Sequence, residues 1–347
     1  MTKTHTGRSA ITALALATAT LFGGASIATA QELNVYTSRE PGLAQPLFDA
    51  FTAGTGIRVN TVFIQQGLAE RVEAEGAASP ADILMVVDYG ALIDLVDRGL
   101  TQQISSPVLE EAIPANVRDP NGHWFGLSMR ARVVYVSADR VDIEAITYEE
   151  LANPEWHDRV CIRSGQHPYN TSLFAAFMAK NGEAATREYL TGLRANLARP
   201  AAGGDRDVAR DILAGICDIA IANSYYVGLM RSGTGGADQQ LWGNAIRVIF
   251  PTFSDGLGTH VNISGAAVAA NAPNRDNAVR LLEFLVSEEA QAIYAQANYE
   301  YPVRPGVAPD PIIASLGTLV VDPTPLVEIS EFRQAASRLV DAVGFDN

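Results

Sequence analysis

The sequence is nearly devoid of lysine and has few charged residues of either sign. Only Lys3 and Lys180 occur among 347 residues, so almost all of the positive charge is carried by arginine. Charged residues make up 18% of the chain and apolar residues 48%, which excludes an acidic disordered tail and a coiled coil. The formal net charge of -14 argues against binding to nucleic acid or to an anionic membrane surface, because both are negatively charged.

Long apolar runs are absent after residue 30. Residues 1–30 carry Lys3 and Arg8 but no acid, followed by an apolar run that ends at the small-residue site Ala28-Thr29-Ala30. This order of features predicts a secretory signal peptide over residues 1–30, with an uncleaved anchor as the alternative. Without this segment the chain has 23 basic and 39 acidic residues, a net charge of -16, and no later segment approaches the ~20 apolar residues of a membrane span.

Cysteine and the usual catalytic motifs are also scarce. Cys161 and Cys217 each lie near the start of an apolar, strand-like run. The sequence is therefore compatible either with a disulfide between them or with two free buried thiols. Neither has a histidine at zinc-ligand spacing. The chain contains no G-x-S-x-G, P-loop or H-E-x-x-H motif, and we therefore expect a binding protein rather than an enzyme. A secreted hydrolase on an α/β scaffold is the alternative from another class.

Short apolar runs alternate with segments of helical periodicity along the whole chain. Strands are predicted at 33–38, 57–64, 81–87, 133–136, 160–163, 218–222 and 265–269. Helices are predicted at 43–54, 68–76, 91–99, 171–180, 183–197, 205–214, 274–296 and 331–343. This alternation predicts βαβ units and an α/β fold in two lobes, in which ligands bind beyond the carboxyl ends of the strands.

Three tyrosines follow predicted strands. Tyr225 and Tyr226 come directly after one strand, and Tyr169 lies in the turn between another strand and a helix. Instead of forming a site, Tyr225 and Tyr226 could have one ring buried and the other on the surface. Tyr169 could instead pack at the start of the helix. Phenolate is a hard oxygen donor, and three tyrosinates would neutralise one ferric ion. If the three phenols cluster, the site they form would suit a ferric ion.

Arginines accompany these tyrosines. Arg39 lies in the first strand–helix turn, and Arg130 and Arg132 lie where the chain is expected to pass between the lobes. The guanidinium group of arginine can bind carbonate or another anion through two hydrogen bonds. The alternative for each of these three arginines is a surface or interdomain salt bridge. A second hypothesis has the same fold, but the arginines bind an anion or an organic solute directly and no metal is involved.

The sequence resembles the periplasmic ferric-iron-binding proteins of bacterial iron(III) ABC transporters, in their tyrosine-rich branch. The resemblance covers the mature chain and is carried by NVYTSRE, PADILMVVDYG, IPANVRDPNGHWFGLSMRARVVYV, CIRSGQHPYNTSL, DIAIANSYYVG, GTHVNISGAAVAANAPN and ANYEYPV. It implies a two-lobed Venus-flytrap fold of type II, each lobe a mixed sheet flanked by helices. It also implies Fe(III) bound with a synergistic anion such as carbonate, a monomer in the periplasm, and an ABC permease as partner.

The resemblance implies roles for particular residues and boundaries for the lobes. The metal ligands fall on Tyr169, Tyr225 and Tyr226, and the anion-binding or charge-balancing positions fall on Arg39, Arg130 and Arg132. Many relatives have His-Tyr after the first arginine, whereas this chain has Glu40-Pro41, which leaves Glu40 as a weaker candidate ligand. We expect residues 31–129 with 258–306 to form the N-lobe, and 130–257 with 307–347 to form the C-lobe.

Overall fold

The computed structural model describes residues 1–4 and 31–347. The strands are β1 Glu32–Thr37, β2 Arg58–Phe63, β3 Ile83–Val86, β4 Phe125–Ser137, β5 Val160–Cys161, β6 Ile219–Asn223, β7 Ile246–Ile249, β8 Val261–Val268 and β9 Tyr301–Pro302. The predicted signal peptide lies almost entirely outside the described residues. Within the described part of the chain, no helix is long and apolar enough to cross a membrane.

Thirteen α-helices are described around these strands. They are α1 Pro41–Thr55, α2 Leu68–Glu75, α3 Tyr89–Asp97, α4 Pro107–Ala112, α5 Pro168–Ala195, α6 Asp205–Leu213, α7 Tyr225–Arg231, α8 Ala237–Asn244, α9 Arg275–Leu285, α10 Glu288–Asn298, α11 Pro311–Ala314, α12 Leu326–Ser330 and α13 Arg333–Ala342. Four short 3-10 helices complete the set: η1 Gly76–Ala78, η2 Ala115–Val117, η3 Glu149–Ala152 and η4 Pro154–Trp156.

The strands form one mixed sheet in the order β2-β1-β3-β8-β4-β6-β5, with β7 and β9 also paired to β4. β1 is parallel to β2 and β3, and β5 is parallel to β6, as the βαβ pattern predicts. The pairings of β8 with β3 and of β4 with β8, β6 and β7 are antiparallel. The α/β prediction is therefore confirmed, and the sheet is mixed.

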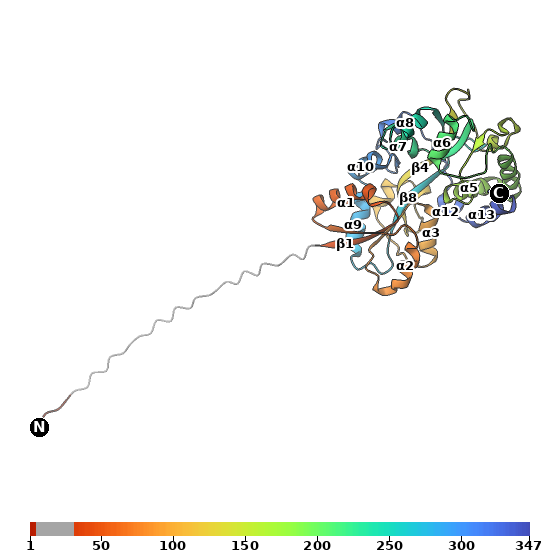
Figure 1. Ribbon diagram of the computed structural model, residues 1–347. Helices are drawn as coiled ribbons and strands as arrows, with labels where there is room; N and C mark the ends of the chain where they lie inside the picture. The colour runs from red at the N-terminus through yellow and green to blue at the C-terminus, as the bar shows by residue number, and fades with distance from the viewer. Residues whose placement is uncertain (5–30) are drawn as a thin grey trace.

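The long strand β4 joins the two ends of the sheet. Its first half, up to Ala131, pairs with β8 and β9, and its second half, from Arg132, pairs with β6 and β7. Figure 1 shows α6, α7 and α8 at one end of β4 and α1, α2 and α9 toward the other. The sequence predicted a strand only at 133–136, because the polar residues Ser128, Arg130 and Arg132 break the apolar run. All of β4 is nevertheless buried.

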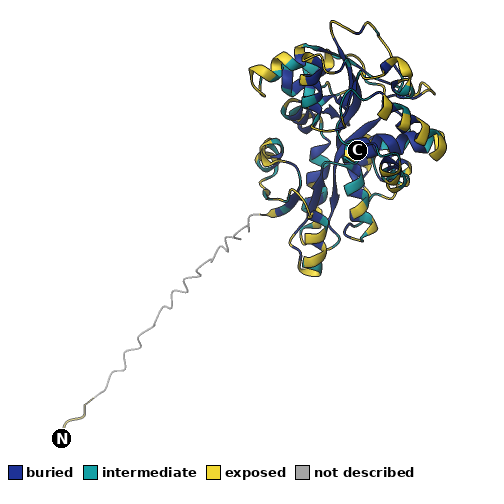
Figure 2. Ribbon diagram, turned by 45° about the vertical axis from the view of Figure 1, so that its right-hand side comes forward, coloured by how far each residue is buried: buried dark blue, intermediate teal, exposed yellow. Residues whose placement is uncertain are grey.

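Three predicted helices are divided differently in the structure. The helices predicted at 171–180 and 183–197 form the single element α5, which is interrupted at Gly182, where φ is 78°. The helix predicted at 274–296 is two helices, α9 and α10, because the hydroxyl of Ser287 accepts a hydrogen bond from Ala290 N and starts the second one. Figure 2 shows the buried residues concentrated on the strands and the exposed ones on the outer helix faces.

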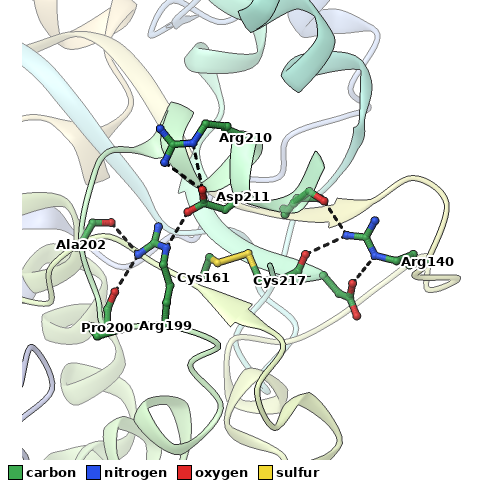
Figure 3. Close-up of a disulfide and its surroundings, with 10 residues drawn as sticks. Arg140, Cys161, Arg199, Pro200, Ala202, Arg210, Asp211 and Cys217 are labelled. Carbon is green, nitrogen blue, oxygen red and sulfur yellow. Dashed lines mark hydrogen bonds and ion pairs between the residues drawn. A yellow bond between two sulfur atoms is a disulfide. The ribbon is translucent and has the colours of Figure 1, made fainter. Parts of the chain in front are cut away.

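Cys161 and Cys217 form a disulfide, with their Cα atoms 5.9 Å apart (Figure 3). Cys161 ends β5, and Cys217 lies two residues before the neighbouring parallel strand β6. Of the two alternatives that the sequence left open, the structure has the disulfide. Closing a loop with a sequence separation of 56 residues reduces the entropy of the unfolded chain, a stabilisation of about 4 kcal/mol.

Candidate functional site

A cavity of ≈ 210 Å³ lies where several strands end. Its walls come from the turn after β1, the end of β3, the middle of β4, the starts of α5 and α7, and the segment between α10 and β9. The lining residues are Ser38, Arg39, Glu40, Leu43, Val87, Arg130, Tyr169, Tyr225, Leu229, Ala297, Asn298 and Glu300. The cavity therefore gathers segments from distant parts of the sequence, at the place where an α/β sheet is expected to bind its ligand.

Tyr225 and Tyr226 are the first two residues of α7, immediately after β6. Their ring centroids are 4.0 Å apart and their planes are tilted by 32°, so the two rings lie against each other. In a strand, consecutive side chains would point to opposite faces. The chain turns into a helix at Ser224, and this turn is what brings the two rings together.

Tyr169 is the second residue of α5 and faces the same cavity. The helix is capped by His167, whose ring accepts a hydrogen bond from the backbone N–H of Tyr169 at 3.2 Å. The His167 and Tyr169 rings are also in edge contact, with centroids 4.5 Å apart. Because His167 caps the helix, Tyr169 has a defined position at the cavity wall.

Burial and neighbouring groups raise the pKa values of Tyr225 and Tyr226. The pKa of Tyr225 is well above its ordinary value, mainly because the side chain is buried and to a lesser extent because Tyr169 and Tyr226 are close. The pKa of Tyr226 is also raised, mainly by burial and to a lesser extent by the neighbouring Asp205 and Tyr169. In the ligand-free protein these two tyrosines are therefore neutral at physiological pH. A cation that binds them must displace their protons.

Arg39 forms a buried ion pair with Glu300 at the cavity wall. Nη2 of Arg39 donates to both carboxylate oxygens of Glu300 at 3.0 Å, and it also donates to Oγ of Ser264. Burial acts to lower the pKa of Arg39, but the Glu300 carboxylate and the nearby phenols of Tyr294 and Tyr225 together raise it above its ordinary value. Arg39 is therefore a permanent cation beside Tyr225.

Arg130 is a second buried cation of this cavity. Its guanidinium lies over the ring of Tyr169, 5.2 Å from the centroid, and 3.8 Å from the carboxylate of Glu300. Nη1 donates to Oγ of Ser264 at 3.1 Å, and Nη2 donates to the carbonyl of Val87. Arg39 and Arg130 are thus brought together with the tyrosines, as predicted.

Arg132 does not reach the cavity. Nη1 of Arg132 forms a buried salt bridge with Asp205 at 2.7 Å and donates to Asn223 at 3.1 Å. Asp205 also accepts from Arg163 at 3.2 Å. Of the two uses considered for Arg132, this geometry matches a salt bridge. Alternation places Arg130 and Arg132 on the same face of β4, but Arg132 lies beyond the change of strand partner after Ala131, where β4 pairs with β6 and Asp205 of α6 is within reach.

Glu40 and Tyr89 differ in their access to the cavity. Glu40 lines the rim, is exposed to solvent, and begins α1 as its N-cap residue. Tyr89 starts α3 and is completely buried, with the guanidinium of Arg333 5.1 Å from its ring centroid. Glu40 is thus positioned where a carboxylate could reach a bound cation, whereas Tyr89 is a packed residue.

Sequence reasoning missed Glu300. This residue is 4% exposed, precedes β9, and receives hydrogen bonds from Arg39, Ser128 and Ser264. Burial alone would raise the pKa of Glu300, but Arg39, Arg130 and Ser128 together hold it below the ordinary value. The only local signal is an acid inside the apolar end of ANYEYPV. Its partners lie far away in sequence, so the pairing follows from the tertiary structure alone.

The oxygen donors of the cavity determine what it can bind. Among the residues described, no cluster of three or more His, Cys, Asp or Glu side chains could hold a metal ion. Glu300 is paired with Arg39, so the oxygen donors that the cavity offers a cation are the phenols and the rim carboxylate of Glu40. Phenolates prefer hard, highly charged cations, and the buried arginines can balance an additional anion.

Comparison with known proteins gives concordant matches. Residues 78–312 match the family described as bacterial extracellular solute-binding protein. The chain is 42% identical over 341 residues to iron uptake protein A2 of Synechocystis, which covers 98% of this chain and 96% of that protein. A Bordetella ferric binding protein is 60% identical, with a TM-score of 0.88, over 91% of this chain and 100% of that one. A Trichodesmium protein solved with iron and citrate ligands is 40% identical, with a TM-score of 0.86, over 90% and 99% of the two chains.

Proposed function

The chain belongs to the bacterial extracellular solute-binding protein family, with its two-lobed periplasmic binding fold, and we propose that it captures ferric iron in the cavity. Tyr169, Tyr225 and Tyr226 bind the ion as tyrosinates, and Glu40 is the weaker candidate for a further oxygen ligand. The observation that carries this proposal is the gathering of these three phenols, two of them lining the cavity and the third stacked on Tyr225.

Charge balance supports a trivalent cargo. Three tyrosinates carry three negative charges, which one ferric ion neutralises. Ionising three partly buried phenols is costly, because their desolvation favours the neutral form. A small trivalent cation compensates this cost better than a divalent one, since its interaction with each phenolate is proportionally stronger. The cavity therefore favours Fe(III) over divalent ions.

Arg39 and Arg130 balance the charge of an additional anion. Both guanidinium groups are buried beside the cavity, and Glu300 neutralises only one of them. An anion such as carbonate that accompanies the ferric ion would complete its coordination and interact with the remaining positive charge. Arg132 contributes to the stability of the fold instead, through Asp205.

Iron capture is accompanied by closure of two lobes about β4. We place residues 31–129 and 258–306 in the N-lobe, and 130–257 and 307–347 in the C-lobe. The change of strand partners between Ala131 and Arg132 supports a boundary at this point. Arg39 and Glu300 then belong to one lobe and the three tyrosines to the other, so a bound ion and anion link the lobes.

The protein delivers its iron to an ABC permease in the inner membrane. Names of similar proteins, such as iron uptake protein A2, support a role in iron import. From the predicted signal peptide we infer that the mature chain works in the periplasm, and from the resemblance we expect a monomer without catalytic turnover. In this role the cavity binds and releases its cargo and does not transform it.

Titration of the purified, chelator-treated protein with ferric citrate tests the proposal. Charge transfer from phenolate to ferric iron should produce a visible absorption band that saturates at one iron per chain. Tyr225→Phe and Tyr226→Phe should abolish the band. Tyr189→Phe is the matched control, because Tyr189 is buried against Phe177 and does not line the cavity. A wild-type protein without a band or stoichiometric iron would overturn the proposal.

The reading in which the arginines bind an organic anion without metal is less well supported. Glu300 already neutralises Arg39 in the ligand-free protein, so the cavity offers an anion less positive charge than the sequence suggests. A thermal-shift panel in chelated buffer separates the two readings. Stabilisation by ferric iron is expected, and stabilisation by an organic anion in the absence of metal would favour the alternative.

A further inference from the structure

Glu300 is the only buried carboxylate among the residues that line the cavity in the described structure. It accepts two hydrogen bonds from Arg39, lies 3.8 Å from Arg130, and is also bonded by the hydroxyls of Ser128 and Ser264. Arg39 and Arg130 share the Ser264 hydroxyl. These groups therefore form one buried cluster of two cations and one anion beside the tyrosines.

The net charge of this cluster depends on Glu300. Two guanidinium groups and one carboxylate leave one positive charge, whereas the arginines alone would leave two. Glu300 is 4% exposed and Arg130 1% exposed, so solvent screens their charges only weakly. The cluster lies next to the phenols, since Arg130 is over the Tyr169 ring and Tyr225 is a neighbour of both arginines. An anion bound with the metal would experience this net charge directly.

We propose that Glu300 is a specificity-determining residue for the anion that binds with iron. Its carboxylate reduces the positive charge of the cluster by one, so the site prefers an anion with one negative charge fewer. The inference rests on the proposed function, because it concerns the anion that enters with the ferric ion. Glu300 accepts hydrogen bonds from Nη2 of Arg39 and neutralises one of the two buried positive charges, which makes the ligand-free cavity a poor site for a free anion. Singly charged oxygen ligands, such as bicarbonate or a monocarboxylate, suit the remaining charge better than dianions of the same size.

A purely structural role for Glu300 would have a different signature. A buried carboxylate that only stabilises Arg39 would affect the free energy of unfolding and would leave the choice among anions unchanged. The two roles are separated by comparing anions that differ in charge but have similar metal-binding geometry. Acetohydroxamate and oxalate form such a pair, since both chelate ferric iron through two oxygens, the first as a bound monoanion after loss of one proton and the second as a dianion.

The experiment measures the affinity of the iron-loaded protein for each anion from the change in its visible band. The quantity of interest is the ratio of the oxalate affinity to the acetohydroxamate affinity at a fixed pH, compared between wild type and Glu300→Gln. This comparison cancels the intrinsic preference of ferric iron for oxalate. One buried unit charge near the anion predicts that the ratio rises in Glu300→Gln by on the order of tenfold to a hundredfold. Calorimetry should also detect oxalate binding to iron-free Glu300→Gln and should detect none to the iron-free wild type.

Asp211→Asn is the matched control. Asp211 is buried to a similar degree and pairs with Arg199 at 2.7 Å, but neither residue lines the cavity. This variant should lose stability without any change in the ratio. If Glu300→Gln does not fold, Arg39→Gln provides the second test, because it removes a positive charge from the same cluster. It should lower the ratio, the opposite direction from Glu300→Gln.

An unchanged ratio in a folded, iron-binding Glu300→Gln, or in Arg39→Gln, would overturn the inference and leave the proposed function intact. Failure of the wild type to form any ferric complex would overturn both. A raised ratio in Glu300→Gln, together with an unchanged ratio in Asp211→Asn, would support a role in anion selection that stability alone does not explain.

Discussion

The guanidinium of Arg130 lies over the ring of Tyr169, with Cζ 5.2 Å from the ring centroid. Arg130 is on the long strand β4, and Tyr169 is at the start of α5. The positive charge of Arg130 also acts to lower the pKa of Tyr225, although burial and the neighbouring phenols raise it further. Arg130 therefore favours the ionised phenols that a ferric ion requires.

Replacement of Arg130 should weaken iron binding. Arg130→Gln removes the cation while retaining polar contacts, and we expect about a tenfold loss of ferric affinity in competition with citrate, from the loss of one favourable charge interaction. Arg130→Lys keeps the charge and should restore part of the affinity. Equal affinities for wild type and Arg130→Gln would show that this charge does not assist the tyrosinates.

Iron should be lost as the pH falls. Tyr225 and Tyr226 have raised pKa values in the ligand-free protein, mainly because they are buried, so iron binding must release their protons. Affinity should therefore fall by about tenfold per pH unit for each proton released. Titration of the visible band between neutral and acidic pH measures this loss, and proton release in weakly buffered solution counts the tyrosines. Binding without proton release would contradict tyrosinate ligation.

Stability should fall between about pH 6.5 and 4 through His260. Burial lowers the pKa of this histidine from 6.5 to about 4, and its Nε2 lies 2.8 Å from Oγ of Ser172. Because the unfolded chain takes up the proton more readily, the contribution is present above pH 6.5 and is lost as the pH approaches 4. The loss is on the order of 3 kcal/mol.

Denaturant unfolding at several pH values measures this dependence. In His260→Gln the free energy of unfolding should depend less steeply on pH over the same range. His157→Gln is the control, because His157 is exposed and pairs only with the neighbouring Asp158 in the described structure. Identical pH dependence in wild type and His260→Gln would exclude this histidine as the cause.

Removal of the disulfide should destabilise the fold and preserve the site. The double variant Cys161→Ser/Cys217→Ser should lose up to about 4 kcal/mol of unfolding free energy, because the unfolded chain regains the entropy of an open loop. Neither cysteine lines the cavity, so the folded variant should keep the visible band and the iron stoichiometry of the wild type. Loss of the band in a folded double variant would show that the disulfide positions the Tyr169 segment.

The sequence predicted much of the secondary structure and most of the candidate site. Strand–helix alternation identified β1, β3, β5 and β6, because a buried strand is a short apolar run that local sequence reveals, and it also identified the partly exposed strand β2. The positions of Tyr169 and Tyr225 after strands also follow from local sequence, whereas the helix α7 that begins at Tyr225 was not predicted. Most of β4 was missed, since buried serine and arginine side chains hide its apolar pattern.

The sequence by itself determined that this is an α/β protein with an arginine-borne positive charge and phenols placed after strands, because composition and periodicity are local properties. The tertiary structure decided which arginine serves which site. Arg130 and Arg132 are two residues apart on one strand, yet the change of strand partners sends Arg130 to the cavity and Arg132 to Asp205. It also brought Glu300 onto Arg39, 261 residues away. Such charge pairs depend on long-range packing, which no local pattern records.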